Sequence, residues 1–205
     1  MNEKAKEIAL KVKDLFKKYG IKSVTMDDVS HELGISKKTL YEYFTDKSSL
    51  VRMVIDCETE IREKHFRETV NSSDSNAIRD MLRIYRFYQK VMKEHNPSFE
   101  YDLKKYYPDI FKELQQIKRE KIMESFLSNL KKGKEEGLYR SDLDEEIIAK
   151  LYVLRIESLT DTDLFTLEER FLPGFWRQLF LYHLYGILSK KGYEYLEKNF
   201  DEIEV

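Results

Sequence analysis

Apolar residues recur at helical spacing along most of the chain. In the first segment the apolar residues that share one face are Ile8, Val12, Leu15 and Phe16. They are followed by Gly20, and glycine commonly ends helices. This spacing predicts a helix over residues 2–19. No segment of any length alternates apolar and polar residues as a half-buried strand does, so the pattern predicts an all-α protein.

Two short helices are predicted next, joined by a tight turn. Thr25 precedes the letters MDDVSHEL, where its hydroxyl can accept hydrogen bonds from the free backbone N–H groups of a helix start. Gly34 ends this helix, and Ser36 offers a second cap before KKTLYEYF. Two capped helices joined by LGIS are typical of a helix-turn-helix, whose second helix enters the major groove of DNA.

Longer helices are predicted after this motif. Asp46 caps a segment that begins KSSLVRMV and ends in the polar letters NSSDSN. The next apolar stripe stops before Asn96 and Pro97, and Pro108 opens a long segment that ends in KKGKEEG. Two helical segments follow, at 142–159 and 173–188. The second is apolar over most of its circumference, so it must be covered on more than one side.

Composition and charge fit this arrangement. The chain has 205 residues, of which 36% are charged, with only 7 Gly and 3 Pro, as in proteins rich in long helices. Residues 1–50 carry 10 Lys against 8 Asp or Glu, whereas the remainder carries 26 basic and 30 acidic residues. The net charge of −2 argues against a wholly basic nucleic-acid binder, so any such surface is expected on one face of the N-terminal segment.

The sequence favours a cytoplasmic location. No apolar run approaches the roughly 20 residues that span a bilayer, and MNEKAKEIAL lacks the apolar stretch of a signal peptide. Cys57 is the single cysteine, which excludes an intrachain disulfide or a cysteine-based zinc cluster. We therefore expect no membrane partner, no metal and no cofactor.

The exposed side of the second short helix is the candidate site. The positions expected to pack are apolar: Val29, Leu33, Ile35, Leu40 and Phe44. The positions expected to face outward are Lys37, Lys38, Thr39, Glu42 and Tyr43. Lys37 and Lys38 begin the helix, at the end that approaches base edges, and lysine donates to O6 and N7 of guanine. We predict that they read the bases of a double-stranded DNA operator.

Phosphate contacts are assigned to hydroxyl-bearing and cationic side chains around this helix. They are Thr25, Ser36, Thr39, Tyr41, Tyr43 and Lys47. Taken singly, a tyrosine or threonine here is more typical of packing or capping, and a lysine pair of a solvated helix face. The joint spacing of caps, turn and exposed groups favours DNA binding.

The stretch TMDDVSHELGISKKTLYEYFTDKSSL, residues 25–50, resembles the TetR family of bacterial repressors. The family shows a capped helix, an LGIS-like turn, a recognition helix with TLY followed by aromatic residues, and K-x-x-L at the start of the fourth helix. The resemblance extends over roughly residues 5–60. It places Lys37 and Lys38 at base-reading positions, and Thr25, Tyr41, Tyr43 and Lys47 at phosphate contacts. Glu42 departs from the pattern, since a carboxylate there repels phosphate; it could accept from a cytosine amino group or face Lys38.

The resemblance also implies two functional domains. A helix-turn-helix DNA-binding domain would cover residues 1–46, and a helical effector-binding and dimerisation domain residues 47–205. Aromatic residues of the middle helices would then surround a small-molecule effector, although core packing is the more typical role of each one. The candidates are Phe87, Phe99, Tyr101, Tyr106 and Phe126.

Useful DNA affinity from one helix-turn-helix normally requires two copies on half-sites about 34 to 36 Å apart. The family pairs its last long helices, which implies a homodimer here. The interface candidates, some of which must also fill the core, are Ile148, Tyr152, Phe175, Trp176, Leu179, Phe180, His183 and Ile187. The same interface could also include Ile147, Leu151 and Ile156 on the first of these helices and Leu188 on the second. By the same resemblance we expect a repressor whose effector shifts the fourth helix.

Two other classes of function remain as alternatives. An enzyme is disfavoured because the four histidines are scattered, no HExxH or glycine-rich phosphate loop occurs, and Cys57 lies in the middle of a helix. A helical adaptor that binds only protein predicts no salt-dependent binding to duplex DNA, which separates it from a regulator.

Overall fold

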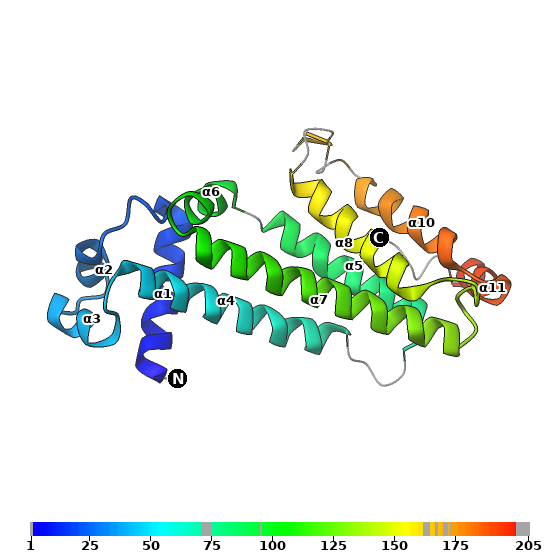
Figure 1. Cartoon of the computed structure of the whole chain (residues 1–205), viewed down its shortest axis with the longest axis horizontal. Coiled ribbons are helices and arrows are strands. Elements are labelled where there is room, and N and C mark those ends of the chain that lie inside the picture. Colours follow the sequence, from blue (N-terminus) through cyan, green and yellow to red (C-terminus); the bar gives the residue numbers. More distant parts are fainter. Residues whose placement is uncertain are drawn as a thin grey trace. The chain divides into compact units, whose positions relative to one another are not determined.

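The computed structural model describes residues 2–70, 75–94, 96–161, 165, 166, 168, 169, 172 and 174–199. Over these residues the regular secondary structure is helical, apart from one isolated antiparallel bridge between Tyr139 and Leu188 (Figure 1). This confirms the all-α prediction. The chain divides into two compact units: unit 1 comprises Met1–His65 and His95–Ile117, and unit 2 comprises Phe66–Glu94 and Lys118–Val205.

Unit 1 contains the N-terminal helices. They are α1 (Glu3–Tyr19), α2 (Met26–Glu32), α3 (Lys37–Tyr43), the first part of α4 (Lys47–Val70), α6 (Pro97–Tyr106) and the start of α7 (Pro108–Glu135). Asn2 caps α1 by accepting from the backbone N–H of Lys4, and Gly20 ends it with φ +83°. A side chain other than glycine is strained at that φ, so this glycine sets the end of the helix.

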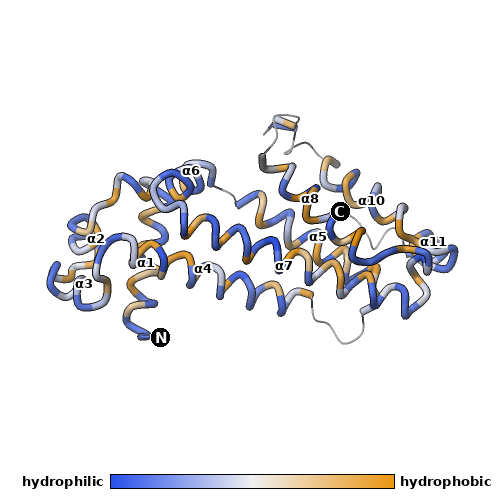
Figure 2. The backbone as a smooth tube through the Cα atoms, viewed as in Figure 1, coloured by the Kyte–Doolittle hydropathy of each residue, from blue (hydrophilic) through white to orange (hydrophobic). Residues whose placement is uncertain are grey.

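The core of unit 1 lies between these helices. Phe16 of α1, Leu40 of α3, Phe44 beyond α3 and Leu50 of α4 are almost completely buried. Hydrophobic positions alternate with hydrophilic ones along α4 and α7, as in helices that bury one face (Figure 2). The two short helices of the candidate site are therefore anchored to the longer helices of this unit by their apolar sides.

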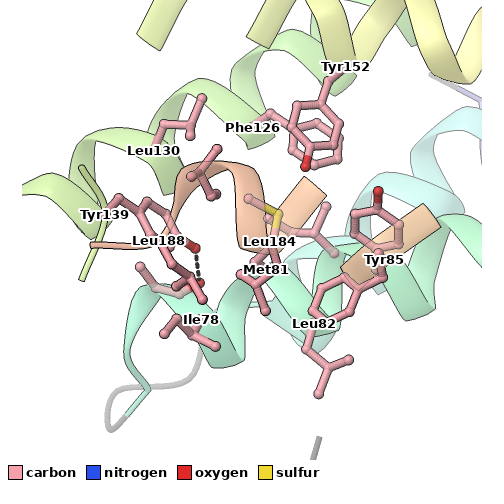
Figure 3. Packing of buried hydrophobic residues seen from close by; sticks show 14 of the residues in the cluster. Ile78, Met81, Leu82, Tyr85, Phe126, Leu130, Tyr139, Tyr152, Leu184 and Leu188 are labelled. Carbon is pink, nitrogen blue, oxygen red and sulfur yellow. Dashed lines mark hydrogen bonds between the residues drawn. The ribbon is translucent and has the colours of Figure 1, made fainter. Parts of the chain in front are cut away.

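Unit 2 contains the remaining helices. They are α5 (Ala77–Lys93), α8 (Glu145–Asp161), α10 (Phe175–Ile187) and α11 (Lys190–Lys198), together with the end of α4 and most of α7. Its core includes Met81, Phe126 and Leu184 (Figure 3). The buried hydroxyl of Tyr139 donates to the carbonyl of Ala77, an interaction drawn as a dashed line in Figure 3, with an O···O distance of 2.9 Å.

The predicted helices are present in the part of the chain that the structure describes. Helix α11 was not predicted from the sequence. Pro173, the expected start of the last long segment, lies outside the described residues, and α10 is described from Phe175. The two compact units are defined by how the chain packs. They do not test the predicted boundary between a DNA-binding domain at 1–46 and an effector-binding domain at 47–205, which stays a prediction. None of the helices in the described part of the chain is long and apolar enough to cross a membrane.

Candidate nucleic-acid interface

Helix α2 begins with a reciprocal cap. The backbone N–H of Asp28 donates to the Thr25 hydroxyl at 3.1 Å, and the backbone N–H of Thr25 donates to the Asp28 carboxylate at 2.8 Å. The Thr25 hydroxyl also donates to that carboxylate at 2.7 Å. These bonds lower the pKa of Asp28, because they stabilise its charged form. A capping box of this kind fixes the residue at which the helix starts.

The turn between α2 and α3 is defined by backbone hydrogen bonds. Gly34 has φ +63°, and its N–H donates to the carbonyl of His31 at 3.1 Å. The N–H of Ile35 then donates to the carbonyl of Ser30 at 3.0 Å. Ser36 caps α3 by accepting from the N–H of Thr39 at 3.0 Å. The start of α3 is thereby held in a fixed relation to α2.

Helix α3 presents a polar face to the outside. Lys37, Lys38, Tyr41 and Glu42 are exposed, and Tyr41 retains 49% of its surface. Lys38 has no ion-pair or hydrogen-bond partner within the part of the chain that the structure describes. It is therefore the more available of the two predicted base-reading lysines.

Lys37 is engaged in an ion pair across the turn. Its Nζ lies 2.5 Å from Oδ2 of Asp27, in the first turn of α2. Both side chains are largely exposed, at 57% and 62%, so water weakens the attraction and the pair can exchange. This pair was not predicted from the sequence, because Asp27 and Lys37 lie on different helices and the spacing within one helix does not bring them together.

Two further predicted contact residues are less exposed than expected. Tyr43 was expected to face outward but is half-buried against the core of unit 1. The reason is helical phase: Leu40, Tyr43 and Phe44 share one face of α3, three and four residues apart. Thr39 is also half-buried and hydrogen-bonds through its hydroxyl to that of Ser36 at 2.9 Å. Their contacts with phosphate remain predictions.

Lys47, the first residue of α4, is the third cation of this surface. Its side chain is half-buried and donates to the carbonyl of Lys22 at 3.3 Å. Burial lowers the pKa of its amine, and the carboxylates of Asp102 and Asp28 partly offset that effect. Asp46 caps this helix, accepting from the N–H of Ser49 at 2.7 Å. The helix start and the lysine both suit a phosphate.

The predicted effector residues are divided between the two units. Phe99 is half-buried in unit 1, where Tyr101 and Tyr106 are exposed. Phe87 and Phe126 are buried in unit 2. Their role around an effector stays a prediction.

A cavity of about 230 Å³ in unit 1 has a different lining. It is bounded by Arg52, Ile55, Asp56, Thr59, Glu60, Glu63, Ile110, Glu113, Leu114 and Ile117. The wall is strongly acidic, and Arg52 pairs with Glu113 at 2.6 Å. None of the five aromatic effector candidates lines this cavity.

The predicted interface residues mostly face the interior of unit 2. Tyr152, Phe180 and Ile187 are buried, and the others are half-buried: Ile148, Phe175, Trp176, Leu179 and His183. The same two helices expose a further apolar set, namely Ile147, Leu151 and Leu154 on α8 and Tyr182 and Tyr185 on α10. Ile147 and Leu151 were among the residues considered for the interface. The other three were missed by sequence reasoning, although their spacing of three and four residues was the available signal.

Comparison with known proteins agrees with this geometry. Residues 13–54 match the family described as bacterial regulatory proteins, tetR family. An HTH-type transcriptional regulator of Staphylococcus aureus (strain USA300) is 36% identical over 74 residues, which are 36% of this chain and 38% of that relative. The chain thus matches well under half the length of its curated relatives.

Solved structures extend the likeness of fold to most of the chain. A transcriptional regulator from Cytophaga hutchinsonii ATCC 33406 superposes with a TM-score of 0.74 at 17% identity, covering 92% of this chain and 100% of that one. A TetR transcriptional regulator from Chloroflexus aurantiacus J-10-FL gives a TM-score of 0.67 at 13% identity, covering 91% and 98%.

The capped motif and the helical unit that follows it define a helix-turn-helix protein with an all-α fold. Within that class, residues 13–54 match the tetR family of bacterial regulatory proteins, and a TetR transcriptional regulator of known structure has a similar fold. The curated relatives that match its N-terminal part are HTH-type transcriptional regulators.

Proposed function

We propose that this protein is a ligand-responsive transcriptional repressor that binds a palindromic operator as a homodimer. The observation that carries the proposal is the pair of capped helices α2 and α3, which present Lys38 without a partner in the described chain and Lys37 in an exposed ion pair. A rigid helix start bearing two lysines suits the major groove, where lysine donates to guanine.

Pairing of two copies is supported by an exposed apolar face on unit 2. On α8, Ile147, Leu151 and Leu154 are 56%, 55% and 60% exposed, and on α10, Tyr182 and Tyr185 are 81% and 47% exposed. A monomer rarely leaves such a set of large apolar side chains in water. A second copy of the same face is the occupant we propose, because two helices from each copy form a four-helix interface across a two-fold axis.

The regulatory step is proposed to run along α4. This helix begins in unit 1 at Lys47, which is assigned to DNA phosphate, and continues into unit 2. An effector in unit 2 that displaces α4 would change the spacing of the two α3 helices in the dimer. By thermodynamic reciprocity the operator would weaken effector binding by the same factor, typically about 1 to 3 kcal/mol of coupling. A regulator of this kind acts beside its operator, in the cytoplasm.

Salt-dependent binding to duplex DNA tests the proposal. Gel-shift titrations on fragments from the upstream region of the protein's own gene should show saturable binding that weakens steeply as salt rises, because lysine–phosphate contacts release counterions. A double variant, Lys37→Ala with Lys38→Ala, should lose sequence preference. Absence of binding in dilute buffer would contradict the proposal and favour a helical adaptor that binds only protein.

A further inference from the structure

Arg155 of α8 is a half-buried cation inside unit 2. Its guanidinium donates to the backbone carbonyl of Leu179 on α10, at 3.4 Å, and to the hydroxyl of Tyr85 on α5. Its Cζ lies 4.8 Å from the ring centre of Tyr152 and 5.7 Å from that of Tyr85. Across the described residues, no carboxylate pairs with this guanidinium.

The neighbours of Arg155 do not neutralise its charge. Burial raises the pKa of Tyr85 to about 12, so its phenol stays protonated and supplies no negative charge. Withdrawing a cation from water is costly unless an anion accompanies it, and neutral oxygens and ring faces offset only part of that cost. The guanidinium therefore retains the capacity to bind an anion with paired N–H donors.

Two polar groups near Arg155 lack hydrogen-bond partners. The hydroxyl of Tyr152 and Nε2 of His183 are both buried and make no hydrogen bond. Tyr152 is only 2% exposed, and its ring centre lies 3.8 Å from that of His183. Burial also holds the pKa of His183 well below its usual 6.5, so the imidazole is neutral. Buried polar atoms are normally satisfied, and two adjacent exceptions point to a ligand that supplies their bonds.

The surroundings of these groups are flat and aromatic. Phe126 stacks on Tyr152 at 3.8 Å with an interplanar angle of 12°, and Tyr88 stacks on Phe126 at 6.1 Å. Phe180 meets the ring of Tyr85 edge-on at 4.8 Å. Figure 3 shows the hydroxyl ends of Tyr85 and Tyr152 turned toward the interior between their helices. The facing surfaces of Phe126 and Tyr152 are occupied by each other, so a planar ligand ring meets these side chains at their edges, an arrangement that aromatic rings favour.

We infer that this part of unit 2 binds a small aromatic carboxylate, with Arg155 holding the carboxylate and the edges of the surrounding aromatic side chains contacting the aromatic group. The inference rests on the proposed function, because it names the chemical class of the regulator's effector. Tyr152 and His183 offer hydrogen bonds to a polar substituent on the ring.

Binding at Arg155 has a direct structural consequence. The guanidinium links α5, α8 and α10 through Tyr85, its own helix and Leu179. A carboxylate that takes over its N–H donors releases the Tyr85 hydroxyl and the Leu179 carbonyl. The helices freed in this way include α8 and α10, which carry the exposed apolar face proposed for dimer contacts. The effector therefore acts on the geometry of the dimer.

The test compares benzoate with benzamide, its uncharged counterpart of nearly equal shape. Calorimetric titration should show benzoate binding at least about tenfold more tightly than benzamide, because the amide lacks the charge that Arg155 recognises. The fluorescence of Trp176, the single tryptophan, should change with the same midpoint because it lies on α10. Arg155→Gln should abolish the preference, and Arg155→Lys should keep part of it. Arg119→Gln is the matched control, since Arg119 forms an exposed pair with Glu157 in the same unit.

Equal affinity for benzoate and benzamide, or no binding of benzoate at millimolar concentration, overturns the inference. If Arg155→Gln fails to fold, Tyr85→Phe replaces it: the variant removes a competitor for the guanidinium, so benzoate should bind at least as tightly as to the natural chain, and weaker binding overturns the assignment. Duplex binding without benzoate is measured separately. Absence of duplex binding together with a preserved benzoate preference contradicts the proposed regulator alone. Duplex binding without a benzoate preference contradicts the effector site alone.

Discussion

Asp27→Asn should increase the affinity of the protein for DNA. The carboxylate of Asp27 holds Nζ of Lys37 at 2.5 Å, so this lysine must leave an ion pair before it can reach a base or a phosphate. The substitution removes the competitor and also removes a negative charge beside the predicted DNA surface. Both effects act in the same direction.

The magnitude follows from the exposure of the pair. Its side chains are 57% and 62% exposed, and pairs of this kind contribute about 0 to 1 kcal/mol. Releasing Lys37 should therefore improve DNA affinity by about two- to fivefold. One added phosphate contact would steepen the dependence of log affinity on log salt by about 0.9. Stability should fall by about 1 kcal/mol or less, because Asp27 also favours the positive end of α2.

Fluorescence anisotropy with a labelled operator, repeated at several salt concentrations, measures both quantities. Asp142→Asn is the control, since it breaks an exposed pair with Arg140 in unit 2 and changes the net charge equally. Unchanged or weaker DNA binding by Asp27→Asn, with its helix content intact, would refute the idea that Asp27 competes with DNA for Lys37.

Three further outcomes are expected. Lys38→Ala should weaken binding to a selected operator by about 1 to 3 kcal/mol and relax the preference at one base pair, measured with operator variants. Leu151→Glu should place a charge on the exposed apolar face of α8 and give a monomer in sedimentation. The folded-state pKa of His183 is depressed, so its contribution to stability is full above the unfolded pKa of 6.5 and is lost as pH falls below it. Urea unfolding at several pH values should show this loss, approaching about 1.4 kcal/mol per pH unit, and His183→Leu should remove it.

Each of these has a matched control. Lys112→Ala, on α7, should leave operator preference unchanged, and a Lys38→Ala variant with the natural preference would end the base-reading assignment. Lys150→Glu changes an exposed, charged position of α8 and should stay dimeric, whereas a dimeric Leu151→Glu would exclude the apolar face. His31→Gln, at an exposed histidine, should keep the pH dependence, which must disappear only in the His183 variant.

Local signals account for what the sequence could predict. The caps at Thr25, Ser36 and Asp46 act on backbone groups two to three residues away, so the bounds of α2, α3 and α4 follow from neighbouring letters. Helix α11 escaped prediction because Gly192 interrupts a short, polar segment. A side chain at Gly192 would collide with the backbone carbonyl of Leu138, a contact that sequence alone does not reveal.

Side-chain partners across different helices could not be predicted. The pair between Lys37 and Asp27 and the contacts of Arg155 depend on how helices pack, and spacing along one helix says nothing of them. For the same reason, the side of α10 that stays exposed was not evident. That helix is apolar nearly all round, and only the packed unit separates buried Phe180 from Tyr182, which is 81% exposed.

Selection of bound sequences from a random pool of duplexes tests the central claim most directly. Two copies of α3 related by a two-fold axis predict enrichment of an inverted repeat whose half-sites lie about one helical turn, or a multiple of it, apart. Lys37→Ala with Lys38→Ala should lose that enrichment. Recovery of no common sequence, or of a single site without inverted symmetry, would contradict the account.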